Sequence, residues 1–214
     1  MRIFVFFWEI KRRSILSALF RMAIGHLFLK PHKRVNFYKL LGTGKGETFT
    51  PKDANLLRWG LIISTSLQID EIKIVKFWRK ISTSEKFYEL SPLSSHGKWA
   101  KRNPFQISNK ISYEGKTVAI TRAKIKRTLA LKFWKSVPPV VTSLKESPGL
   151  IWSIGIGESP IGLQGTFSLW ENPQALENFA FKSNPHKEVI RKTRDLDWYS
   201  EELFARFKVV TEAE

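Results

Sequence analysis

The chain has 214 residues, of which 43% are hydrophobic, and it carries a formal net charge of +17 at pH 7 and no cysteine. This composition is typical of a globular cytoplasmic protein of one large or two small domains, and it excludes disulfides, zinc fingers and cysteine-bound haem or iron–sulfur clusters. The charge favours polyanions such as anionic lipid, but the basic residues are scattered without an RNP-type motif, so no specific nucleic-acid partner is expected.

The first thirty residues raise the question of membrane insertion. The apolar run 3–8 precedes the basic residues 11–13, which is the reverse of the order in a signal peptide. The next apolar run, 15–29, is interrupted by an arginine and a histidine and is shorter than the ~20 residues that cross a bilayer. We expect a buried strand and a mostly buried helix, with a helix lying on the inner membrane surface as the alternative.

The remaining pattern of the first half predicts alternating strands and helices. Apolar residues at spacings of three, from Ile72 to Ile81, indicate an amphipathic helix that buries one face. The expected elements, in chain order, are strand 3–10, helix 14–29, strands 36–41 and 56–64, helix 69–81 and strand 86–90. This order is βαββαβ.

The second half repeats the same order. Its expected elements are strand 118–125, helix 130–144, strands 150–155 and 163–170, helix 173–198 and strand 203–210. Two short matches indicate an internal duplication, EIKR at 9–12 with KIKR at 124–127 and SEKF at 84–87 with SEELF at 200–204. Their offsets nearly agree, at 125 − 10 = 115 for the isoleucines and 204 − 87 = 117 for the phenylalanines.

The predicted fold class is therefore α+β, with two tandem ferredoxin-like halves, each an antiparallel sheet with two helices on one face. We place the halves at 1–97 and 117–214, with 98–116 as a connecting loop. The sheets either pack face to face into a barrel or lie side by side. In both arrangements the open face of each sheet must meet a partner sheet, a second chain or a ligand.

Two glycine-rich stretches follow strands at equivalent places, GTGKGETF at 42–49 and GIGESPIG at 155–162. Neither has the spacing and the Lys-Ser/Thr pair of a P-loop. We interpret both as turns between the second and third strands of each half.

Catalytic patterns are sparse in this sequence. The adjacent carboxylates Glu201 and Glu202 are explained as solvated charges at the end of a helix. His26, His32 and His96 are interpreted as structural or surface residues.

His186 has a more distinctive position. Asn184 suits an N-cap and Pro185 suits the first helical position, so His186 falls in the first turn of a helix whose apolar face continues at Val189 and Ile190. The positive end of the helix disfavours imidazolium and leaves a lone pair available. From spacing alone, a hydrogen-bonded core histidine and a metal or haem ligand both remain open.

Five blocks of the second half resemble one known family. TRAKIKRTLALKFWKSVPPV at 121–140, GIGESP, LQGTFSLW, FAF and HKEVIRKTRDLDWYSEELFARF occur in the order found in the spheroidene monooxygenases, the acyclic-carotenoid ketolases. FYKLLGTGKGETFTP at 37–51 and SPLSSHGKW match more loosely, whereas the loop 98–116 shows little match.

The resemblance implies an oxygenase that uses O2, an external electron donor and haem iron, and that acts on an apolar polyene such as a carotenoid. The chlorite dismutase group, which has a similar tandem architecture, ligates haem through a histidine on a C-terminal-half helix, which implies His186 as the ligand. Gln164 and Arg122 are the candidates to hydrogen-bond iron-bound oxygen or a haem propionate. A non-catalytic ligand-binding module and a haem-free oxygenase or lyase remain as alternative functions. Whether the chain forms a homo-oligomer also remains open.

Overall fold

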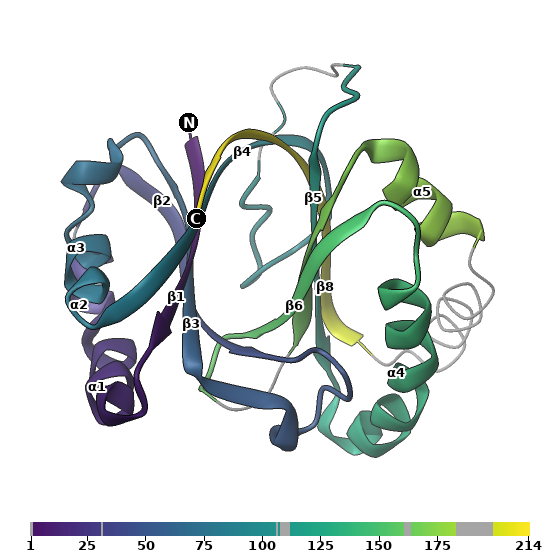
Figure 1. Cartoon of the computed structure of the whole chain (residues 1–214), viewed down its shortest axis with the longest axis horizontal. Coiled ribbons are helices and arrows are strands. Elements are labelled where there is room, and N and C mark those ends of the chain that lie inside the picture. The colour runs from purple at the N-terminus through teal and green to yellow at the C-terminus, as the bar shows by residue number, and fades with distance from the viewer. Residues whose placement is uncertain (1, 31, 106, 108–111, 161–163, 183–198) are drawn as a thin grey trace.

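Eight antiparallel strands form a closed barrel, and the helices pack against its outside in two groups (Figure 1). The structure is a computed structural model, and it describes residues 2–30, 32–105, 107, 112–160, 164–182 and 199–214. His186 lies outside the described residues.

The elements follow the predicted order in both halves. The first half contains β1 (Arg2–Ile10), α1 (Ile15–Ile24), α2 (His26–Leu29), β2 (Val35–Gly44), β3 (Ala54–Thr65), α3 (Lys73–Arg79) and β4 (Ser82–Gly97). The second contains β5 (Thr117–Ile125), α4 (Ala130–Lys145), β6 (Leu150–Gly157), β7 (Gly165–Trp170), α5 (Pro173–Lys182) and β8 (Tyr199–Ala213). Short 3-10 helices are η1 (Arg12–Ser14), η2 (Pro51–Asp53), η3 (Ile69–Glu71) and η4 (Arg127–Leu129).

Around the barrel the strands run β4-β1-β3-β2 and then β6-β7-β5-β8, so each half has the ferredoxin-like order. The predicted fold class is confirmed. The closing strands β4 and β8 are much longer than expected, with 16 and 15 residues, because they pair with each other along the seam between the halves. Of the two arrangements left open, the halves adopt the barrel: the inner faces of both sheets share one core, and their edges join at β4–β8 and β2–β6.

The glycine-rich stretches form the second seam, and our interpretation of them as turns is wrong for their first residues. Gly42 pairs with Gly157 and Gly44 pairs with Gly155, which joins β2 of one half to β6 of the other. A Cβ on Gly42 would lie 2.2 Å from the carbonyl oxygen of Ser159, so no side chain fits at this approach. These glycines therefore allow two sheet edges to meet and close the barrel.

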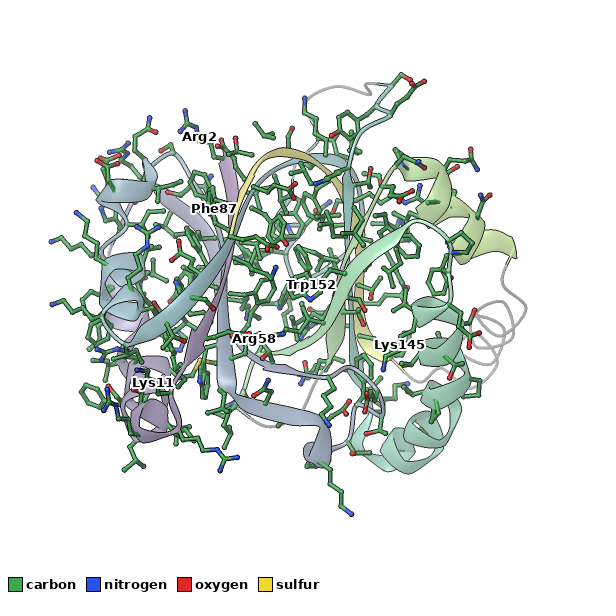
Figure 2. The ribbon with its side chains drawn as sticks, viewed as in Figure 1. Arg2, Lys11, Arg58, Phe87, Lys145 and Trp152 are labelled. Carbon is green, nitrogen blue, oxygen red and sulfur yellow. The ribbon has the colours of Figure 1, made fainter. Side chains whose placement is uncertain are left out.

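Alternation along the strands separates two apolar cores. In β1, Val5 and Phe7 face the barrel interior, whereas Phe6 and Trp8 face the helices α1 and α3. Both faces of β1 are buried, which explains its unbroken apolar run. Figure 2 shows Trp152 inside the barrel, where its ring packs edge-on against Phe7 at 5.3 Å.

Part of the segment between β4 and β5 enters the barrel. Trp99 and Phe105 are 1% and 0% exposed, and both rings pack edge-on against Phe37 at 5.5 and 5.8 Å. Ala100 and Lys101 adopt positive φ angles of 56° and 64°, which turn the chain back towards the barrel rim. The segment is therefore partly a core element.

Candidate functional site

An apolar cavity of about 150 Å³ lies between helix α4 and the sheet of the second half. A cavity of this size lined by apolar side chains is large enough for a benzene-sized group. Its walls come from both halves of the chain: Gly46, Phe49, Thr121, Arg122, Ala123, Val137, Val140, Val141, Leu144, Gln164, Gly165, Thr166, Tyr199 and Phe204. Among the sequence candidates, Arg122 and Gln164 both line it.

Helix α4 supplies the apolar wall. Val137, Val140, Val141 and Leu144 line the cavity, and their spacing of i, i+3, i+4 and i+7 places them on one helical face. The two prolines inside the helix, at positions 138 and 139, are exposed and lie outside this face. β-Branched and leucine side chains present hydrocarbon without hydrogen-bonding groups, so this wall favours an apolar ligand.

A loop from the first half closes the opposite wall. The side chain of Asp53 accepts hydrogen bonds from the backbone N–H groups of Glu47, Thr48 and Phe49 at 2.7, 2.9 and 3.0 Å. Asp53 is 5% exposed, so it holds the loop from within and fixes Phe49 at a φ of 58°. Lys145 at the end of α4 bonds Glu47 at 3.0 Å and ties this loop to the helix of the other half.

The base of the cavity is formed where β5 and β7 begin to separate. Gln164 immediately precedes β7, and its backbone is bonded to the two neighbouring strands. Its N–H donates to the carbonyl of Ile156 on β6, and its carbonyl accepts from the N–H of Ala123 on β5. Its side-chain oxygen lies 3.4 Å from Nη2 of Arg122. The structure therefore brings together the two polar candidates, which are separated by 42 residues in the sequence.

Arg122 is the hub of a charged cluster that the sequence interpretation missed. One guanidinium nitrogen donates to Glu158 at 2.7 Å, and the other donates to Glu201. Glu158 also accepts from Lys39 and from the indole of Trp99 at 2.8 Å. The Arg122 side chain is 6% exposed, and its Nε is buried with no hydrogen-bond partner among the described residues.

The carboxylates of this cluster are held in their ionised form. Burial opposes ionisation of Glu158, but the hydrogen bond and charge of Lys39, with Trp99 and Arg122, outweigh it and lower its pKa. Burial also opposes ionisation of Glu201, yet the N–H groups of Lys101 and Ala100 and the charge of Arg122 lower the pKa of that carboxyl. The cluster is therefore charged at neutral pH.

Glu201 corrects an earlier expectation. It lies within β8, where its side chain is 15% exposed and accepts hydrogen bonds from the backbone N–H groups of Ala100 and Lys101, so it is not a solvated terminal charge. Glu158 lies in the second glycine-rich stretch, which the sequence analysis interpreted only as a turn. The available signal was Arg122, a charged residue in the otherwise apolar strand β5, because a buried charge requires a partner of opposite charge.

The described histidines lie away from the cavity. His26 contacts Tyr38 at 3.3 Å, and His26, His32 and His96 are all exposed. Among the described residues, no cluster of three or more histidine, cysteine, aspartate or glutamate side chains could hold a metal ion. The predicted ligand His186 lies outside the described residues. Tyr199, the first residue of β8, lines the cavity.

Comparison with known proteins identifies relatives across nearly the whole chain, although no family model matches it. The chain is 36% identical to a spheroidene monooxygenase of Rhodobacter capsulatus, over 92% of this chain and 85% of the relative. It is 31% identical to the spheroidene monooxygenase of Cereibacter sphaeroides, over 94% of this chain and 63% of the relative.

Solved structures support the fold. An aldoxime dehydratase superposes with a TM-score of 0.52 at 9% identity, and it covers 97% of this chain and 80% of its own length. A second aldoxime dehydratase, in complex with butyraldoxime, gives 0.51 at 11% identity over 97% of this chain and 79% of its own. The sequence relatives show that the chain belongs to the spheroidene monooxygenase family and is an oxidoreductase that acts with oxygen.

Proposed function

We propose that the chain is a haem-dependent monooxygenase that inserts oxygen into an apolar, carotenoid-like substrate, with the α4 cavity as part of its active site. The observation that carries the proposal is the contrast within this cavity. Its α4 wall is hydrocarbon, whereas its base is lined by Arg122 and Gln164, which connect it to a charged cluster on the barrel side of the sheet. An oxygenase for an apolar substrate requires this combination, because the substrate needs an apolar wall and activated oxygen needs hydrogen-bond donors.

The described residues fit a haem in two respects. The α4 face offers an apolar surface for one edge of a porphyrin ring, since the cavity by itself holds only a benzene-sized group, and Arg122 offers a buried Nε–H with no partner among the described residues. The chain has no cysteine, so a histidine or tyrosine would bind the iron. We propose His186 for this role.

When bound, haem supplies the activation of O2, and the protein supplies position, protons and a dry site. Gln164 is proposed to hydrogen-bond oxygen through its amide, because its backbone is fixed between β5 and β6. Arg122 is proposed to stabilise negative charge at the base of the cavity, as a guanidinium held in place by Glu158 and Glu201. The α4 wall excludes water from the apolar side.

The balance of the reaction requires a partner. A monooxygenase transfers one atom of O2 to the substrate and reduces the other to water, which consumes two electrons and two protons. We propose an external electron donor for this step. The substrate class is proposed from the names of the relatives and from the apolar wall, which suits a polyene chain.

Haem titration tests the proposal. The purified chain is expected to develop the Soret band of histidine-ligated haem at equimolar haem, and His186→Ala is expected to lose it. His96→Ala is the matched control, because His96 is exposed on β4 and should leave the band unchanged. A wild-type protein without a Soret band overturns haem dependence, and spheroidene turnover that survives complete haem removal identifies a haem-free oxygenase instead.

A further inference from the structure

Helices α1 and α2 carry an apolar stripe that faces solvent. Leu16, Phe20 and Leu27 are 80%, 58% and 72% exposed, although their neighbours Ala18 and Met22 are buried against the sheet. Positions 16, 20 and 27 are separated by four and seven residues, so they lie on one side of the helical path. Burial of the inner face holds these helices in place and leaves the outer stripe permanently presented.

Basic residues surround this stripe. Between Glu9 and Glu47 the sequence contains nine lysines and arginines and no acidic residue. The exposed positions include Lys11, Arg12 and Arg13 before α1, Lys30, Lys33 and Arg34 after α2, and Lys73, Lys76, Arg79 and Lys80 on or beside α3. Arg34 and Arg79 are paired with Glu71 and Glu85. Helix α3 is a direct neighbour, because the rings of Phe28 and Phe77 lie 5.0 Å apart.

We propose that the α1–α2 face docks on the surface of an anionic phospholipid bilayer. Leu16, Phe20 and Leu27 would enter the boundary between headgroups and acyl chains, and the basic rim would contact phosphates. Among the described residues, no helix is long and apolar enough to cross a membrane. Lys11, which precedes α1, and Lys145, at the end of α4, lie on opposite sides of the barrel (Figure 2).

Charge distinguishes lipid from a second copy of the chain. A symmetric dimer through this face would bring two basic rims together, and like charges across an interface oppose association. An anionic headgroup surface instead gains from every one of these charges. The helices α1 and α2 lie on the opposite side of the barrel from α4, so docking leaves the cavity uncovered (Figure 1). The proposal is independent of haem and of the proposed function.

Co-sedimentation of the full chain with vesicles tests the docking face. Vesicles of phosphatidylcholine are compared with vesicles in which about one third of the lipid is phosphatidylserine. The wild type is expected to bind the anionic vesicles, and added salt is expected to weaken binding because the Debye length shortens. Two variants are each expected to bind the anionic vesicles at least about tenfold more weakly than the wild type. They are the triple variant Leu16→Ser, Phe20→Ser, Leu27→Ser and the double variant Arg12→Gln, Arg13→Gln.

Matched controls separate this face from general hydrophobicity and charge. Ile151→Ser with Val210→Ser removes exposed apolar groups elsewhere, and Lys52→Gln with Lys124→Gln removes exposed charges elsewhere; both should bind as the wild type does. Absence of wild-type binding, or equal binding by the triple serine variant, overturns the proposal. A wild-type dimer in solution that the serine variant converts to monomer also overturns it, in favour of a second copy. Folding is verified by circular dichroism.

Discussion

Arg122 Nη2 on β5 lies 2.7 Å from Glu158 Oε1, which directly follows β6, and this pair sits where the base of the cavity meets the barrel interior. Trp99 donates to the same carboxylate at 2.8 Å, so the segment between the two halves is bonded to the pair. The ion pair therefore links Arg122, which lines the cavity, to Glu158 beside the β2–β6 seam, and through Glu158 to Trp99 in the core of the barrel.

Arg122→Gln is expected to destabilise the protein by about 3 kcal/mol, because it removes the guanidinium that two partly buried carboxylates share and leaves Glu158 with Lys39 alone as its cation among the described residues. Urea unfolding followed by circular dichroism measures the change. Arg206→Gln is the control, since its bond to Glu177 has a similar length, 2.8 Å, but the side chains are 30% and 44% exposed, and the expected cost is about 0–1 kcal/mol. Equal losses in the two variants would show that the buried pair contributes no more than a surface pair.

The carboxylates Glu158 and Glu201 predict an acid-sensitive component of stability. Both have a pKa below the ordinary 4.5 in the folded state, so their contribution is complete above that value and is lost as pH falls through the folded pKa. We expect Glu201→Gln to be less stable than the wild type at neutral pH, and the difference to shrink at acidic pH. Unfolding free energies measured across this range test it, and a difference that stays constant contradicts the linkage.

The glycine seam predicts a steric effect. A Cβ on Gly42 would lie 2.2 Å from a backbone oxygen, so Gly42→Ala is expected to cost about 3 kcal/mol and to loosen the contact of β2 with β6. Gly115→Ala provides the control, because there the added carbon meets only the end of the Tyr113 side chain, at 2.6 Å from the hydroxyl. Hydrogen exchange of the β2 and β6 amides would report the opening, and unchanged exchange would refute it.

Filling the cavity should remove binding without unfolding the chain. Val140→Phe adds a ring to the α4 wall, and we expect haem affinity or substrate turnover to fall by about tenfold or more. Val210→Phe makes the same change at an exposed position of β8 and should leave both properties intact. Unchanged affinity and turnover in the Val140 variant would place the ligand outside this cavity.

The predicted duplication was accurate because each half has a local signature. Strands with β-branched and aromatic residues alternate with amphipathic helices, and these periods report secondary structure directly. The closing strands were predicted too short, because their outer residues, such as Ser94 and Ser95, are polar and pair only with the other half. Local pattern cannot show an edge whose partner is more than a hundred residues away.

The sequence by itself determined the order of elements, the apolar character of β1 and the absence of thiolate ligands, because periodicity and composition are local properties. The role of His186 as an iron ligand stays a prediction. Only the tertiary structure decided that the glycine stretches join two sheets and that Arg122 meets Glu158 and Glu201, which are 36 and 79 residues away. Barrel closure fixes which strand edges meet, and buried charges then pair with whatever that closure brings within reach.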